Sequence, residues 1–216
     1  RYRQAEHVVR AAGLNPPIRH LAATGGLLWH PQARMDLVRA GIGLYGLSPD
    51  PSVATSAELG LRPAMRLESP LVQVKRIEAG QAVSYGGTWR APTDRWVGLV
   101  PLGYSDGIPR AASSTGPVGV GSIMTTIVGR VCMDQVVVDL GPAVDETGAP
   151  LPAPARVGDA AVLWGAPASA DPEAVPTADE WAQVCGTINY EIVTRLGARV
   201  PRCYVGNHGT GDYSRP

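Results

Sequence analysis

Apolar positions along the chain follow two different periods. Near the start, Ala5, Val8, Val9 and Ala12 recur at helical i, i+3, i+4 and i+7 spacing, which predicts an amphipathic helix. A Gly-Leu-Asn-Pro-Pro run at residues 13–17 ends it, because glycine and proline rarely continue a helix. The helix begins at the first residues without a capping side chain, so we expect the chain to be part of a longer protein.

Short strands and helices then alternate up to about residue 62. Strands are expected at 18–22 and within 35–46, and a short helix is expected to begin at 24–26. This alternation is typical of parallel βα units. Residues 1–62 are therefore predicted to be the end of an α/β barrel or of a doubly wound sheet.

From residue 63 onwards, β-branched and apolar runs are separated by Gly, Pro and Asp turns, which predicts a mostly-β domain over 63–206. Two short helices are expected near its end, one capped by Thr177 and one at 189–196. Residues 207–216 are polar and predict a disordered tail. The expected strands lie in "SPLVQVKRI", "WVGLVPLGY", "TTIVGRVCMDQVVVDL" and "AAVLWG".

Composition excludes several classes of function. The 216 residues have a formal net charge of zero and are 44% hydrophobic, so the chain can form a core but has no excess charge for nucleic acid. The three cysteines, Cys132, Cys185 and Cys203, lack metal-ligand spacing and do not indicate a disulfide framework. No apolar run is long enough to cross a bilayer. We expect no metal, nucleic-acid or membrane partner.

The segment "GYSDG", residues 103–107, matches the G-x-S-x-G pattern of serine hydrolases. That pattern requires a helix directly after the serine, but Pro109 and a Ser/Gly run follow here. The one downstream histidine, His208, lies in the polar tail. A tight turn containing Ser105 and Asp106 is therefore favoured over a nucleophile.

A second segment predicts phosphate binding. Arg39 ends a predicted strand and is followed by Ala-Gly-Ile-Gly, whose glycines allow backbone N–H groups to approach a ligand. The helix that begins at Thr24 offers further N–H groups. A third segment, "VSYGGTW" at 83–89, places Tyr85 beside two glycines. Taken alone, this tyrosine is more easily interpreted as sheet packing than as a proton donor.

Five motifs, in this order, together resemble the C-terminal part of bacterial alanine racemases, which are fold-type III enzymes dependent on pyridoxal 5'-phosphate (PLP). The resemblance implies that residues up to 62 are the last strands and helices of a TIM barrel and that the rest is a β-rich C-terminal domain. The motifs are "MDLVRAGIGLYG", "VSYGGTW", "PLGYSDGIPR", "VGRVCMDQVVVDL" and "INYEIVTRLGARVPRCYV".

The resemblance also implies residue roles. Tyr85 would be one of two acid/base groups, acting in the partner subunit's active site. Arg39 would hydrogen-bond the pyridine nitrogen, with His20 supporting it. The phosphate would be bound by Thr24, Gly41, Ile42 and Tyr190. The Met133 backbone N–H would bind the substrate carboxylate, and Tyr104 and Asp134 would line the entrance and the substrate pocket.

The implied activity is interconversion of L- and D-alanine for peptidoglycan by a cytoplasmic homodimer with shared active sites. Racemisation removes the α-proton on one face and returns it on the other, so two bases are needed. The second base, a Schiff-base lysine, lies upstream in the family, and Lys75 reads instead as an exposed strand residue. We therefore expect the 216-residue chain alone to be inactive. A non-catalytic assembly module remains the alternative, and serine- or lysine-accepting relatives share these motifs.

One departure from the family concerns the phosphate helix. The family has Ala-Asn-Ser before it, whereas this chain has Ala22-Ala23-Thr24. The hydroxyl is kept and the amide is lost, so we expect the phosphate contact of Thr24 to remain without the support of an asparagine.

Overall fold

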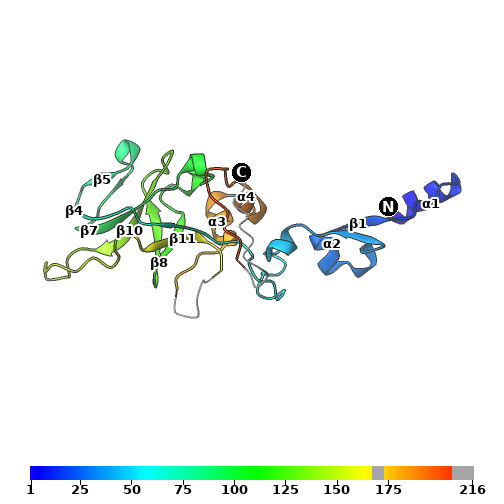
Figure 1. Cartoon of the computed structure of the whole chain (residues 1–216), viewed down its shortest axis with the longest axis horizontal. Coiled ribbons are helices and arrows are strands. Elements are labelled where there is room, and N and C mark those ends of the chain that lie inside the picture. The colour runs from blue at the N-terminus through cyan, green and yellow to red at the C-terminus, as the bar shows by residue number, and fades with distance from the viewer. Residues whose placement is uncertain (167–172, 206–216) are drawn as a thin grey trace. The chain divides into compact units, whose positions relative to one another are not determined.

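The computed structural model describes residues 1–166 and 173–205. The chain divides into two compact units, residues 1–64 and residues 65–216. Each unit is described by itself below, and Figure 1 gives the order of their elements along the chain. The predicted disordered tail, 207–216, lies outside the described residues.

The first unit follows the predicted helix–strand alternation. It contains α1 (Tyr2–Ala11), β1 (His20–Ala23), α2 (Thr24–Trp29) and β2 (Leu37–Arg39). Strands β1 and β2 pair in parallel, as expected for a β-α-β unit. A 3-10 turn, Ile42–Tyr45, follows β2 and packs its first residue inward, since Ile42 is buried.

The second unit is built on a seven-stranded sheet whose described pairs are all antiparallel. The spatial order is β3-β11-β8-β9-β10-β7-β4, so β3 and β4, which are neighbours along the chain, occupy opposite edges. The strands are β3 (Leu67–Pro70), β4 (Gln73–Ile77), β7 (Arg95–Val100), β8 (Pro117–Val120), β9 (Ile123–Val128), β10 (Val136–Pro142) and β11 (Ala160–Trp164).

Buried and exposed positions alternate in β10, whereas β11 is buried on both faces from Ala161 to Trp164. In β10, Val136, Val138 and Leu140 are buried while the residues between them are partly exposed. This period of two is the pattern of a half-buried antiparallel strand. The predicted strands are confirmed, and β8 is an additional strand that the sequence did not indicate.

Two helices, α3 (Ala178–Cys185) and α4 (Asn189–Thr194), follow the sheet and lie side by side (Figure 1). The predicted Thr177 cap is confirmed, because its Oγ1 accepts the Glu180 N–H at 3.1 Å. Trp181 is buried and its indole N–H donates to the Leu163 carbonyl of β11, which ties α3 to the sheet. Among the described residues, no helix is long and apolar enough to cross a membrane.

Candidate active site

Tyr85 lies in a turn between two short paired strands, β5 (Ala82–Val83) and β6 (Trp89–Arg90). The 3-10 segment Tyr85–Gly87 is kinked at Gly86, which has φ 74°, and Gly87 has φ 53°. These left-handed conformations favour glycine. The Tyr85 side chain is 72% exposed. It therefore lies outside any strand and is not a packing residue of this unit.

Arg130 borders the same turn. A Cβ built on Gly86 would lie 3.5 Å from the Arg130 guanidinium carbon. The sequence alone gave no reason to single out Arg130, because its place next to Gly86 depends on a contact between segments more than forty residues apart.

The three predicted substrate-pocket residues of the second unit are close together. Tyr104 begins a 3-10 turn, Tyr104–Asp106, and its backbone N–H donates to the Cys132 carbonyl at 3.0 Å. The next N–H, that of Ser105, donates to the Met133 carbonyl at 3.0 Å. The side chains of Tyr104 and Met133 are exposed. Two backbone hydrogen bonds thus join the turn at residues 104–106 to the bend at residues 132–135.

Charged side chains surround this contact. Asp134 forms an ion pair with Arg199 at 2.8 Å, and Arg199 also reaches the buried Asp106 at 3.3 Å. The Arg199 guanidinium and then the Ser105 hydroxyl hold the pKa of Asp134 below its usual value. Asp134 is therefore a carboxylate near neutral pH, and Arg199 is a residue that sequence reasoning missed.

Ser105 is not arranged as a nucleophile. The segment after it is another 3-10 turn, Arg110–Ala112, rather than an α-helix. Within the described residues, its hydroxyl contacts the Met133 carbonyl, Asp134 and Arg199. The serine-hydrolase alternative has no structural support, and the expected tight turn is confirmed.

The predicted phosphate residues of the first unit also lie together. Thr24 is buried at the start of α2, and its Oγ1 accepts the backbone N–H groups of Gly41 at 3.0 Å and Gly43 at 3.4 Å. Arg39 ends β2 and donates to the Leu21 carbonyl at 3.2 Å. A Cβ on Gly43 would lie 2.8 Å from the Thr24 methyl group, so glycine permits this close approach.

The two remaining predicted residues lie elsewhere. His20 is exposed at the first position of β1, two residues before the strand's one buried residue, Ala22. Tyr190 belongs to α4 of the second unit, where burial raises the pKa of its phenol. Its relation to the phosphate residues of the first unit stays a prediction.

Comparison with known proteins identifies the family. The family described as "Alanine racemase, C-terminal domain" matches residues 64–204, and "Alanine racemase, N-terminal domain" matches residues 1–49. The chain belongs to the alanine racemase family. Its predicted fold class is confirmed, namely part of a TIM barrel followed by a mostly-β domain.

Individual relatives agree with this assignment. The chain is 48% identical over 205 residues to an alanine racemase of Streptomyces coelicolor, covering 95% of this chain and 49% of the relative. It is 50% identical over 207 residues to one of Thermobifida fusca, covering 95% and 50%. A solved alanine racemase from Streptomyces coelicolor A3(2) superposes with a TM-score of 0.85 at 47% identity, covering 95% and 50%. The chain spans about half the length of the curated relatives it matches.

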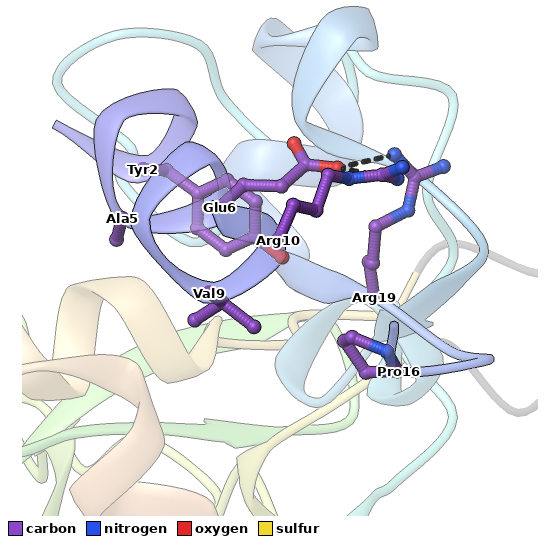
Figure 2. A pocket seen from close by; sticks show the side chains of 7 residues that line it. All are labelled: Tyr2, Ala5, Glu6, Val9, Arg10, Pro16 and Arg19. Carbon is purple, nitrogen blue, oxygen red and sulfur yellow. Dashed lines mark hydrogen bonds and ion pairs between the residues drawn. The ribbon is translucent and has the colours of Figure 1, made fainter. Parts of the chain in front are cut away.

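One cavity of the first unit is lined by none of the predicted site residues. Figure 2 shows it between α1 and the segment that follows, lined by Tyr2, Ala5, Glu6, Val9, Arg10, Pro16 and Arg19. Glu6 accepts hydrogen bonds from Arg19 at 2.9 Å and Arg10 at 3.1 Å, and Arg19 first of all lowers the pKa of its carboxyl. The charged groups that line this cavity are therefore paired with one another. Across residues 1–166 and 173–205, no cluster of His, Cys, Asp and Glu could hold a metal ion.

Proposed function

We propose that the full-length protein containing this chain is a PLP-dependent alanine racemase that interconverts L- and D-alanine and supplies D-alanine for peptidoglycan. The observation that carries the proposal is the match to both alanine racemase domains, together with relatives near 50% identity that bear this name. The exposed phenol of Tyr85 and the grouping of Thr24, Gly41 and Arg39 support it.

The residues of the first unit fit a phosphorylated pyridine. The Thr24 hydroxyl accepts hydrogen bonds and donates to no acceptor within the described residues, and the Ile42 backbone N–H donates to none there either. Both can donate to a phosphate oxygen. Arg39 keeps guanidinium N–H groups beyond the one that reaches Leu21, and these would serve the ring nitrogen. When bound, PLP would withdraw electrons from the substrate α-carbon and make its proton acidic.

Arg39 would restrict the reaction to proton exchange. An arginine does not give up its proton under ordinary conditions, so it only donates to the ring nitrogen and leaves that nitrogen unprotonated. The electron demand on the substrate is then moderate, which limits side reactions such as transamination. An aspartate in the same place would have the opposite effect.

Tyr85 would move the proton on one face of the substrate α-carbon. Its phenol is exposed on a glycine turn that Arg130 borders, so the hydroxyl is accessible for proton transfer. The lysine that serves the other face in the family has no counterpart here, because Lys75 is exposed on the edge strand β4. Meanwhile the Met133 N–H would hold the substrate carboxylate, with Tyr104 and Asp134 lining the approach.

Assembly follows from the same roles. In the family the tyrosine acts in the partner subunit's site, so we propose a cytoplasmic homodimer with two shared active sites and a small amino acid as substrate. His20 would support Arg39, and Tyr190 would complete the phosphate contacts. Whether alanine is preferred over serine or lysine is decided by turnover with each of the three.

The test is racemisation of L-alanine by the full-length protein carrying its PLP. We expect Tyr85→Phe to lower turnover by roughly 10²–10⁴-fold, the usual contribution of a positioned acid/base group, while PLP stays bound. Tyr204→Phe is the matched control, because Tyr204 is 74% exposed and has no proposed role. Full activity in Tyr85→Phe would remove Tyr85 from the mechanism. An inactive unmodified protein that still dimerises would favour the assembly module.

A further inference from the structure

The "GYSDG" motif is not explained by the functions assigned so far. Ser105 lies in its centre, and its hydroxyl is 2.8 Å from the Met133 carbonyl, 2.9 Å from Asp134 Oδ1 and 2.8 Å from Arg199 Nη1. A hydroxyl has one proton and two lone pairs. Ser105 therefore accepts from Arg199 and donates to one of the two oxygens on the bend.

The side chain of Arg199 connects its own segment of the chain to both the bend and the turn. Its guanidinium contacts Asp134 on the bend at 2.8 Å, and both Ser105 and Asp106 on the turn at 2.8 and 3.3 Å. Asp106 is 4% exposed and also accepts the Gly103 N–H at 2.9 Å, which fixes its carboxylate. A planar guanidinium can serve several acceptors in fixed directions, which an ammonium group cannot do equally well.

The turn and the bend approach so closely that a side chain could not replace Gly103. A Cβ there would lie 2.2 Å from the Met133 carbonyl oxygen. The Cys132 N–H donates to the Gln135 carbonyl at 3.1 Å, which closes the bend on itself. The bend is therefore held by its own backbone bond, by the turn and by Arg199.

This arrangement determines where the Met133 N–H points. The Cys132 carbonyl accepts from Tyr104, so it faces the turn. In a trans peptide the N–H points opposite to the carbonyl of the same peptide group. The Met133 N–H therefore points away from the turn, and within the described residues it has no acceptor.

We propose that Arg199 is a positioning residue, which acts through Ser105 and Asp134 to keep the Met133 N–H aimed at the carboxylate of the amino-acid substrate. The inference rests on the proposed racemase function for the identity of the ligand. The hold of Arg199 on the bend rests on contacts within the second unit alone. Loss of Arg199 weakens substrate binding without removing a base.

The experiment uses the full-length PLP-bound protein and the variants Arg199→Met, Arg199→Lys and Ser105→Ala. Arg195→Met is the matched control, since Arg195 lies in the same segment and pairs with Glu191 at 2.6 Å without contacting the bend. Two quantities are measured. The first is KM and kcat for L-alanine, with the inhibition constant of propionate, which has the carboxylate of the substrate but no amine. The second is amide hydrogen exchange at Tyr104, Ser105 and Cys132.

We expect Arg199→Met to raise KM and the propionate constant by about tenfold with kcat changed less than about threefold, the pattern of lost ground-state binding. Amide exchange at the three positions accelerates. Arg199→Lys recovers part of both effects, and Arg195→Met changes neither. Combining Arg199→Met with Ser105→Ala gives less than the product of the single effects, because both act through one set of contacts.

Other outcomes overturn the inference at identifiable points. Unchanged exchange in both Arg199→Met and Ser105→Ala means that Arg199 does not hold the bend. Faster exchange with unchanged KM and propionate constant means that the bend does not bind the carboxylate. If the unmodified protein does not racemise alanine, the proposed function and the carboxylate role fail together. Amide hydrogen exchange would still show whether Arg199 holds the bend in place. Should Arg199→Met not fold, Ser105→Ala decides both questions.

Discussion

Ser84 packs directly against Gly129, immediately before the turn that carries Tyr85. A Cβ on Gly129 would lie 2.9 Å from the Ser84 Cβ and 3.0 Å from its Oγ. Ser84 has φ 61° and ψ 179°, a conformation that is almost confined to glycine. Its hydroxyl is buried and has no hydrogen-bond partner in the described chain. Backbone strain and an unpaired polar atom therefore meet next to the proposed acid/base group.

Replacing Ser84 by glycine is expected to stabilise the full-length protein. Relief of the strained backbone contributes about 1–3 kcal/mol, and the added freedom of the unfolded chain opposes it by about 0.5–1 kcal/mol. The thermal midpoint should rise by about 1 °C for each net kcal/mol, because the entropy of unfolding grows with chain length. Ser84→Ala keeps the strain and loses only the hydroxyl, so its midpoint should lie between those of the parent and Ser84→Gly. A lower thermal midpoint in Ser84→Gly than in the parent would contradict the conclusion that the Ser84 backbone is strained.

Gly129→Ala should be markedly destabilising. The new methyl group would meet Ser84 and would also sit at φ 74°. Gly121→Ala is the matched control, because Gly121 has φ 57° but nothing within 4 Å of its built Cβ. The control loses about 1–2 kcal/mol from the left-handed backbone alone, and Gly129→Ala loses about 1–3 kcal/mol more from overpacking. Urea unfolding of both variants measures the difference in stability. Equal losses of stability would mean that Ser84 moves aside for the new methyl group.

The Arg199–Asp134 ion pair should make stability depend on pH in acid. Arg199 lowers the pKa of Asp134 in the folded protein, so the folded state binds its proton less readily than the unfolded state does. The stabilisation by the ion pair is fully present above the unfolded pKa of about 4, and it is lost as pH falls through the lower pKa of the folded state. Asp106 also faces Arg199, so Asp134→Asn is used to isolate the pair.

Thermal midpoints of the parent and Asp134→Asn should therefore differ near pH 6 and converge towards pH 2. The direction follows from protonation, because a neutral Asp134 resembles the asparagine that replaces it. A constant difference across this range would assign the effect of the substitution to packing or hydrogen bonding instead of charge.

Active sites shared between subunits should allow two inactive variants to restore each other. Full-length Tyr85→Phe is mixed with a variant lacking the cofactor lysine that the family carries upstream. In each mixed dimer one site has both defects and the other has neither. With random exchange, about a quarter of the parent activity should return, since half of the dimers are mixed. Two differently tagged copies monitor exchange, and exchange without recovered activity would show that Tyr85 acts within its own chain.

Local elements could be predicted from the sequence because short-range interactions determine them. The spacing of Val8 and Val9 indicated α1, Thr177 and Glu180 formed the expected cap of α3, and the β-branched, apolar run along 136–140 indicated β10. Tyr85, Met133 and Arg39 were reached through a resemblance carried by whole motifs, since "VSYGGTW" alone favoured packing. Strand β8 was missed because Pro117 and Gly119 weaken the strand signal, although pairing on both sides stabilises it.

The tertiary structure alone decided which distant residues meet. Arg199 reaches Ser105, which is 94 positions away in the chain, and Gly129 meets Ser84 only because β9 returns beside the turn after β5. No local pattern encodes such contacts, because they depend on how the antiparallel sheet reverses the chain and on which backbones can approach. The sequence by itself determined most of the elements, the family resemblance and the chemical groups available. The fold decided that Tyr85 is exposed on its turn. It also decided that the Met133 N–H points away from its supporting turn, because the Tyr104 N–H donates to the Cys132 carbonyl across a long stretch of chain.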